Sequence, residues 1–403
     1  MMNIKNKLVR GSLILLFLVG IFNILNFLYH LLMARILPVE DFGLLKRVFA
    51  FMYMGAIFME SIQTVVVKYA SKPFQEEGKL KNIFLRATKG IVKPAIIIVI
   101  IFLVASLFIS PIFNIPYTLL FVTSLFIASS MFIPIARGIL QGQQRFFALG
   151  GSMLCEAILK IGISFLLVYM GFGVFGAIGG VAISLILSIG ISLIYIRKVL
   201  RSKSEFAELG GIKSYSKPVF IVTLVLILFL NIDILLAGYF FSDFDAGTYA
   251  ISSTIALIIF IGIQPINKVL FPITASESAE KKPSKQNFVR AITVILLMCI
   301  VALTIIILFT DDLIYILSNK ILPRAYAPTI ILSVGTAFLS LTSTILYYKL
   351  SKGNTYGYKY ISLFLLLEIV LLAIFSSSVI NYSYAFLVSN IIFFIGSVVL
   401  LRK

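Results

Sequence analysis

Long apolar runs, separated by short polar segments, make up most of this sequence. A helix that crosses the hydrocarbon core of a bilayer needs about 20 apolar residues, and these runs reach that length without alternating polar positions. The pattern predicts an all-α polytopic membrane protein and argues against a barrel of alternating strands. We expect twelve transmembrane helices, at residues 11–34, 44–67, 91–110, 117–137, 147–170, 173–196, 217–240, 247–271, 289–310, 326–348, 359–377 and 381–401.

The composition agrees with this class, because 60% of the residues are hydrophobic, 12% are charged and the mean hydropathy is +1.09. A net charge of +18 on a soluble face would suggest nucleic acid, but in so apolar a chain basic residues orient the helices. We therefore expect a multi-pass plasma-membrane protein with both termini cytoplasmic, and with membrane lipids but no nucleic acid among its partners. The basic residues outside the cytoplasmic segments are Arg35, Lys46, Arg47, Lys320 and Arg324 on the outer side and Lys160 within a span.

A helix–turn–helix pattern at Asn26–Arg47 recurs at Asn231–Tyr249, which suggests that the chain contains two related halves. The repeat aligns Ala34 with Gly238, Asp41 with Asp245 and Gly43 with Gly247. The predicted division is an N-terminal six-helix lobe at 1–200, a cytoplasmic linker at 201–216 and a C-terminal six-helix lobe at 217–403.

Ionisable side chains deep in the predicted spans are candidates for function, because leaving one in lipid costs at least a few kcal/mol. The candidates are His30, Arg35, Glu60, Glu156, Lys160, Asp233 and Glu368. Glu156 and Lys160 are four residues apart on one helical face, so they form an internal ion pair or leave Lys160 to contact an anionic substrate. His30 either titrates near neutral pH or is a hydrogen-bonded structural residue.

The acids Asp233, Glu60 and Glu368 are candidates for ion coupling. A buried carboxylate without a basic partner binds a proton or a sodium ion, whereas one paired across helices is structural. The sequence leaves both interpretations open for each of them.

Enzymatic motifs are mostly missing. The chain has one histidine and no GxxxxGK[ST] or GxSxG motif, so we expect no enzyme, no cofactor and no metal site. An alternative remains: Asp243 and Asp245, or Asp311 and Asp312, hold a divalent metal and a diphosphate sugar in a membrane glycosyltransferase. As turn-forming and helix-capping residues they need no such role.

Several segments resemble one family of membrane transporters. They are Ala34–Pro38 with Glu40–Leu44, Gly171–Ala177, Asp233–Gly238 with Gly247–Tyr249, and Val269–Pro272. These segments resemble the polysaccharide or O-antigen flippases of the multidrug/oligosaccharidyl-lipid/polysaccharide (MOP) exporter superfamily, over most of the chain.

The resemblance implies two six-helix lobes around a central cavity, as in multidrug and toxin extrusion (MATE) transporters. It also implies transfer of a polyprenyl- or dolichyl-diphosphate-linked oligosaccharide from the cytoplasmic to the outer leaflet by alternating access. Arg35 and Asp233 match the family's motifs. The cavity candidates for substrate binding are Arg35, Lys160, Glu156 and His30, and H+ or Na+ is the expected coupling ion. Deep cations are few beside the deep acids, so a cation-coupled multidrug exporter remains the alternative.

Overall fold

The structure is a computed structural model, and it describes residues 2–71, 76–207, 213–279, 285–352 and 360–402. These residues form helices and no strand. The chain divides into two compact units, the first made of Met1–Met33 and Phe51–Ser216, the second of Ala34–Ala50 and Lys217–Lys403. Part of the predicted linker, residues 208–212, lies outside the described residues.

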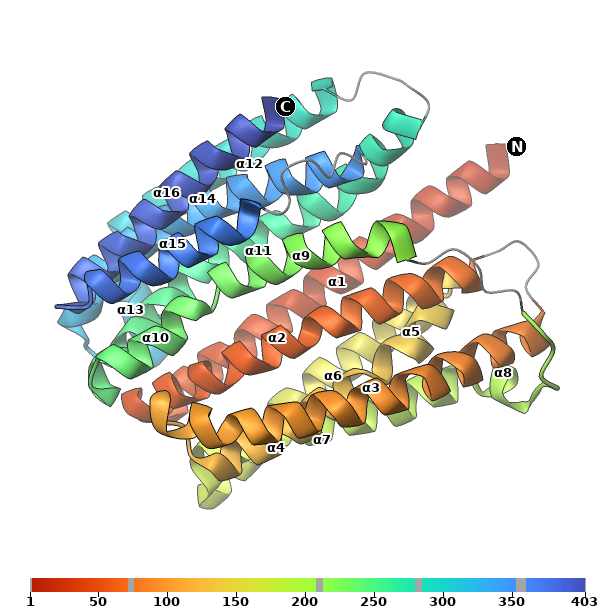
Figure 1. Cartoon of the computed structure of the whole chain (residues 1–403), viewed down its shortest axis with the longest axis horizontal. Coiled ribbons are helices and arrows are strands. Elements are labelled where there is room, and N and C mark those ends of the chain that lie inside the picture. Colours follow the sequence, from red (N-terminus) through yellow and green to blue (C-terminus); the bar gives the residue numbers. More distant parts are fainter. Residues whose placement is uncertain (1, 72–75, 208–212, 280–284, 353–359, 403) are drawn as a thin grey trace. The chain divides into compact units, whose positions relative to one another are not determined.

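Two long helices are shared between the units (Figure 1). They are α1 (Met2–Ile36) and α2 (Val39–Ala70). The remaining helices of the first unit are α3 (Glu77–Ile112), α4 (Tyr117–Ser130), α5 (Ile133–Gly142), α6 (Phe146–Leu167), the π-helical turn η1 (Val168–Phe172), α7 (Gly173–Tyr195) and α8 (Arg197–Arg201). The second unit contains α9 (Lys213–Phe229), α10 (Ile232–Phe240), α11 (Asp243–Ala279), α12 (Lys285–Leu308), α13 (Thr310–Ser318), the short 3-10 turn η2 (Pro323–Ala325), α14 (Tyr326–Ser351), α15 (Ile361–Ile374) and α16 (Val379–Arg402).

The turn between α1 and α2 belongs to the second unit, although the sequence-based division assigned it to the N-terminal lobe. The reason is a close backbone approach: a Cβ on Gly43 would lie 2.7 Å from the Cα of Gly247. Glycine permits two backbones to come this near because it has no side chain. Gly43 and Gly247 are the residues that the repeat aligns, so equivalent positions of the two halves meet here.

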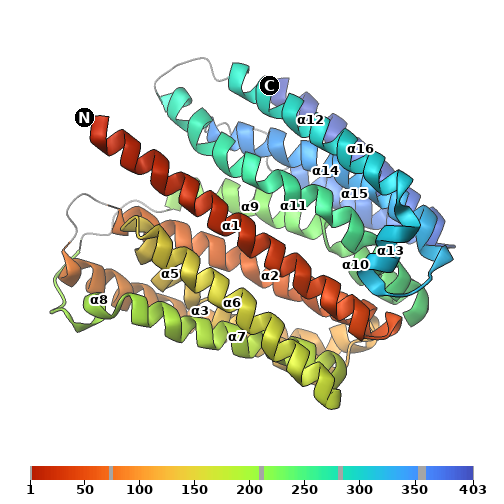
Figure 2. The same ribbon diagram turned by 180° about the vertical axis from the view of Figure 1, so that it is seen from behind.

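The core of the first unit includes the hairpin of α6 and α7 (Figure 2). The chain reverses at Gly171 and Gly173, whose φ angles of 92° and 50° favour glycine. A Cβ on Gly176 would lie 2.8 Å from the carbonyl carbon of Leu167, and one on Gly180 would lie 2.5 Å from the nitrogen of Ser164. The small-residue face of α7 therefore sets close helix packing.

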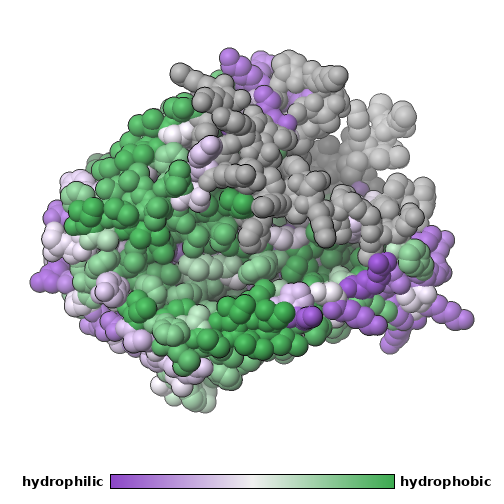
Figure 3. All heavy atoms as spheres, viewed as in Figure 1, coloured by the Kyte–Doolittle hydropathy of each residue, from purple (hydrophilic) through white to green (hydrophobic). Residues whose placement is uncertain are grey.

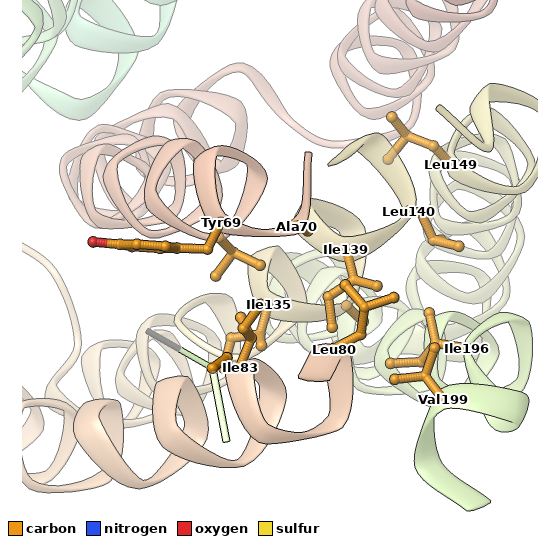
Figure 4. Close-up of a cluster of buried hydrophobic side chains, with 13 residues drawn as sticks. Tyr69, Ala70, Leu80, Ile83, Ile135, Ile139, Leu140, Leu149, Ile196 and Val199 are labelled. Atoms are coloured by element: carbon orange, nitrogen blue, oxygen red, sulfur yellow. The ribbon is translucent and has the colours of Figure 1, made fainter. Parts of the chain in front are cut away.

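Figure 4 shows a second apolar core of this unit. Tyr69 of α2, Leu80 of α3, Ile139 of α5, Leu149 of α6 and Val199 of α8 contribute to one buried cluster. Burial of these side chains packs the short helix α8 against the longer ones.

Two predicted spans are broken helices, and a proline accounts for one of the breaks. Pro134 stands at the start of α5, where a proline has no amide hydrogen to donate to the preceding turn, so α4 ends before it. Asn231, with φ −140° and ψ −17°, separates α9 from α10, and the two helices meet at a bend of 40°.

The second unit is built around α14, which packs against α11, α12 and α16, while α15 packs against α10 and α16. Most of the α14 side chains are buried. One apolar cluster of the second unit includes the stacked rings of Phe229 on α9 and Phe393 on α16, whose centroids are 4.4 Å apart.

By length and composition, nine helical stretches of the described residues can cross a membrane, and ten if the bent α9–α10 pair is one span. The stretch Phe146–Tyr195 comprises both α6 and α7, and α15, at Ile361–Ile374, is shorter than the span expected at 359–377. Figure 3 shows hydrophobic side chains over the middle of α3 and hydrophilic ones toward its α8 end. The chain is therefore a helical membrane protein, and twelve remains a predicted count.

Candidate functional site

The first unit holds a buried ion pair with a full set of partners. Arg137 of α5 donates to the Glu156 carboxylate of α6 at 2.6 Å, to the Ser188 hydroxyl of α7 at 3.0 Å, and to the hydroxyl and carbonyl oxygens of Ser152, each at 3.2 Å. The Arg137 and Glu156 side chains are 6% and 17% exposed. An ion pair between Glu156 and Lys160 was one of two alternatives left open by their i,i+4 spacing. In the structure Glu156 pairs with Arg137, since α5 packs against α6.

Lys160 is buried on the same helix but has a different environment. Its ammonium donates to the side-chain carbonyl of Asn26 and lies 4.7 Å from the centre of the Tyr29 ring. The Tyr29 hydroxyl in turn donates to the carbonyl of Ala177 at 3.1 Å. The ammonium is thus held by an amide oxygen and an aromatic face, and the carboxylate of Glu156 lies within electrostatic range.

His30 is buried beside this group. Its Nε2 is 3.0 Å from the Tyr53 hydroxyl, and its ring packs edge-on against Tyr29. Glu60, by contrast, lies at an exposed position of α2. The structure thus places His30, Glu60, Glu156 and Lys160 in one unit, with Glu60 at an exposed position and the other three less exposed.

In the second unit, basic residues fasten the turn between α1 and α2. Arg35 Nε donates to the carbonyl of Ile316 at 2.8 Å. Lys320 Nζ donates to the carbonyls of Ala34 and Leu37 at 2.8 and 2.9 Å, where the end of α1 leaves them without helical partners. Partial burial lowers the pKa of Lys320, and the carboxylate of Glu40 opposes this shift.

Arginines form ion pairs with Asp243 and Asp245, one of the two acidic pairs that the glycosyltransferase alternative offers as a metal site. Arg47, which is buried, donates to Asp243 at 2.8 Å, and Arg324 donates to Asp245 at 3.2 Å. Asp245 also receives a hydrogen bond of 3.1 Å from the Ser242 hydroxyl at the start of α11. Both carboxylates therefore have arginine or capping partners, and within the described part of the chain no group of three or more potential metal ligands is found.

The two most deeply buried acids of the second unit are Asp233, at the start of α10, and Glu368, on α15. Asp233 is 1% exposed and accepts a hydrogen bond of 2.8 Å from the Tyr249 hydroxyl of α11. Tyr382 of α16 donates to the backbone carbonyl of Asp233 at 2.7 Å. The second carboxylate oxygen of Asp233 is buried without a hydrogen-bond partner.

Glu368 of α15 is 0% exposed and lies within electrostatic range of Asp233. Both of its carboxylate oxygens are buried without a hydrogen-bond partner, as is the side-chain oxygen of Asn390 on α16. Oxygens buried in this way are costly unless something binds them. A proton on a carboxyl group, or a bound cation, would satisfy such oxygens.

The sequence predicted Asp233 and Glu368 as candidates but missed their neighbours. Lys46 of α2 is 3% exposed and lies within electrostatic range of Asp233. Tyr249 and Tyr382 were also missed, since tyrosines are common in apolar helices. Lys46 did carry a signal, because it is a basic residue on the outer side, against the charge bias of the chain.

The comparisons with known proteins agree with this architecture. A family described as "Polysaccharide biosynthesis protein" matches residues 32–322, well over half of the chain. The chain belongs to this family. The match contains the turn between α1 and α2, the Arg137–Glu156 pair and Asp233, and it confirms the family resemblance predicted from the sequence.

A relative from Methanocaldococcus jannaschii, "Uncharacterized membrane protein MJ1375", is 26% identical over 273 residues. The matched region covers 61% of this chain and 62% of the length of that relative. The printed name of this relative agrees with the assignment of the chain as a membrane protein.

Solved structures show the same fold. "Lipid II flippase MurJ, inward closed conformation" superposes with a TM-score of 0.74 at 17% identity, over 97% of this chain and 88% of that one. An inward-facing multidrug resistance MATE family transporter of the MOP superfamily gives a TM-score of 0.72 at 14% identity, over 94% of both chains. The chain therefore belongs to the family described as "Polysaccharide biosynthesis protein" and has the fold of the MurJ and MATE structures of the MOP superfamily.

Proposed function

We propose that the protein transfers a polyprenyl- or dolichyl-diphosphate-linked oligosaccharide from the cytoplasmic to the outer leaflet, for cell-surface polysaccharide synthesis. The observation that carries this proposal is the family match at residues 32–322 on a transporter fold. Sugars made in the cytoplasm and assembled outside need such a step, because the charged head group does not cross the bilayer unaided.

The proposed architecture is twelve transmembrane helices in two six-helix lobes, in a plasma-membrane protein with both termini cytoplasmic. The lobes rock against each other and open a central cavity to each side in turn. The meeting of Gly43 and Gly247 supports a duplicated origin of the halves.

In this mechanism Arg35 and Lys160 contact the phosphates, with His30 and Glu156 nearby in the substrate path, while the lipid tail stays in the bilayer. The buried ammonium of Lys160, held by Asn26 and the Tyr29 ring, supports this assignment. Arg35 keeps donors beyond the one that bonds Ile316, and the planar guanidinium suits phosphate oxygens.

Uptake of H+ or Na+ at Asp233 and Glu368 drives the cycle in this proposal, and their unpartnered oxygens support it. Glu60, exposed on α2, has less support as a coupling residue. A cation-coupled multidrug exporter is the second candidate, favoured by the MATE structures that share the fold.

The test is transfer of a lipid-linked oligosaccharide by the purified protein in liposomes, with Arg35→Gln and Lys160→Gln combined. We expect transfer to fall about 100-fold or more, because each lost charge-assisted contact is worth about 1.5–3 kcal/mol. Arg324→Gln, the same change at an exposed arginine, is the matched control and retains transfer. Full transfer by the double variant would reject these phosphate contacts, and drug export without oligosaccharide transfer would favour the second candidate.

A further inference from the structure

One exposed face of α3 changes from basic to apolar along the helix. Arg86, Lys89 and Lys93 are exposed and follow one another at steps of three and four residues, so they share one side of α3. The same steps continue into exposed apolar side chains, which are Ile97, Ile100, Val104 and Phe108. Figure 3 shows this change along α3. An exposed apolar face of a membrane-spanning helix meets lipid chains, so the basic residues at its end lie at the depth of the head groups.

A strap made of residues 202–207, which follow α8, lies along the start of α3. The backbone nitrogen of Glu205 donates to the carbonyl of Gly78 at 3.1 Å. Arg86 donates to the carbonyl of Ala207 at 3.1 Å, so the strap is fastened to α3 at two places about two helical turns apart. These bonds hold the side chains of the strap beside the basic residues of α3.

Phe206 is the apolar side chain that the strap presents to the outside. It is 75% exposed, although the residues on either side of it are hydrogen-bonded to α3. The guanidinium carbon of Arg86 lies 5.7 Å from the centre of its ring, within the range of a cation–π contact. An aromatic ring held beside a basic row is suited to the interface between lipid chains and water, where one side of the ring is apolar and the other is wet.

The charges of this row are not balanced by neighbouring acids. Within the part of the chain that the structure describes, no carboxylate forms an ion pair with Arg86, Lys89 or Lys93. Glu76, before the first turn of α3, lies 3.9 Å from Lys79 and not beside the row. The row therefore offers three positive charges to an anionic partner.

The second half of the chain shows that the fold does not require lysines at these places. The sequence offset that aligns the two repeats pairs Lys89 with Thr293 and Lys93 with Leu297, both on α12. Thr293 and Leu297 are also exposed. The two lysines thus distinguish α3 from its counterpart, which points to a role in binding.

We propose that this surface, the α3 patch, binds the head groups of anionic phospholipids. The patch comprises Arg86, Lys89, Lys93 and Phe206. The arginine and the lysines donate to the lipid phosphate, the ring lies among the first carbons of the acyl chains, and the apolar face of α3 contacts the rest of the chains. In the proposed orientation these are lipids of the cytoplasmic leaflet, and they fix the start of the first span at the membrane surface.

The test uses a fluorescent reporter, because the chain contains no tryptophan and Phe206→Trp therefore gives a single one at the patch. The purified full-length protein is reconstituted in phosphatidylcholine liposomes that contain either brominated phosphatidylglycerol or brominated phosphatidylcholine. Quenching of the tryptophan measures which lipid lies beside it. We expect a preference for phosphatidylglycerol of about tenfold or more, because each basic residue near a lipid surface contributes roughly fivefold.

Variants in the same reporter background separate charge from shape. Lys89→Gln combined with Lys93→Gln should lower the preference about fivefold or more, whereas Lys89→Arg combined with Lys93→Arg keeps both charges and should retain it. Leu297→Trp, in the chain with Phe206 intact, is the matched control on the counterpart helix. The two lipids should quench this reporter within about twofold of each other.

Three results would overturn the proposal. They are equal quenching of the reporter at position 206 by the two lipids, a preference that the paired glutamine variant does not change, and the same preference at position 297. A reporter at position 206 that neither lipid quenches would also reject it, since the strap would then meet water or protein. The assay contains no oligosaccharide, so its result is independent of whether the protein transfers one.

Discussion

The two units bury acids in opposite ways. In the first, the Glu156 carboxylate receives a hydrogen bond of 2.6 Å from Arg137, which is itself held by serines of α6 and α7. In the second, Asp233 and Glu368 are more deeply buried, yet three of their carboxylate oxygens lack hydrogen-bond partners. A satisfied network of the first kind stabilises a fixed packing, whereas the unpartnered oxygens of the second kind are those that the proposed uptake of H+ or Na+ would satisfy.

The largest effect should follow from breaking the satisfied network. Arg137→Met leaves Glu156 buried without its base and strands the serine hydroxyls, which we expect to cost about 3 kcal/mol of stability. Thermal unfolding of the purified protein measures this loss. Glu156→Gln, which keeps a hydrogen-bond acceptor for Arg137, should cost less. An Arg137→Met variant as stable as the original would mean that the network is not structural.

A smaller loss should follow from disturbing the turn that carries Lys46. In Gly43→Ala the new Cβ would lie 2.7 Å from the Gly247 Cα, and backbone atoms cannot move aside as a side chain can. We expect a cost of about 2 kcal/mol, measured by thermal unfolding. Gly190→Ala is the matched control, since open space surrounds Gly190 on α7 and alanine favours a helix by roughly 0.5–1 kcal/mol. Equal stability of the two variants would contradict the close approach at Gly43.

Replacing one of the unpartnered acids, in contrast, should not lower the stability of the protein. Glu368→Gln replaces a buried carboxyl group whose oxygens have no hydrogen-bond partner, so we expect stability to stay level or to rise by about 1 kcal/mol. The same variant should weaken the dependence of transport on an H+ or Na+ gradient. Stability and gradient dependence are measured on one preparation, and a loss of stability near that of Arg137→Met would place Glu368 in a structural network instead.

The smallest effect should come from an exposed pair. Arg324→Gln removes the 3.2 Å contact with Asp245, in which the arginine side chain is 72% exposed. Exposed pairs are worth about 0–1 kcal/mol, so thermal unfolding should shift little. A large loss would show that this contact helps to hold the start of α11.

Much of the fold was predictable because apolar runs and helix breakers act locally. Most of the predicted ranges fall on helices, two of them on broken ones, and the break before Pro134 follows from the chemistry of proline. The close packing of Gly176 and Gly180 on α6 also follows from their spacing. Each of these features depends on residues that are near one another in sequence.

Partners across helices were harder to predict. Nothing in the spacing of Glu156 and Lys160 indicates that Arg137, 19 residues before Glu156, forms the closer pair. The inclusion of Ala34–Ala50 in the second unit likewise depends on contacts with residues about two hundred positions away. The basic residues on the outer side were the available signal. Arg35, Arg47, Lys320 and Arg324 all bond within the second unit, and Lys46 lies near Asp233.

The most direct test of the account is leaflet transfer of a polyprenyl-diphosphate oligosaccharide by the purified protein in liposomes, with and without an imposed H+ or Na+ gradient. The account predicts transfer well above that of protein-free liposomes, accelerated by one of the two gradients. It also predicts that Asp233→Asn abolishes the acceleration while leaving the protein folded. Transfer no faster than in protein-free liposomes, or an Asp233→Asn variant with unchanged gradient dependence, would contradict it.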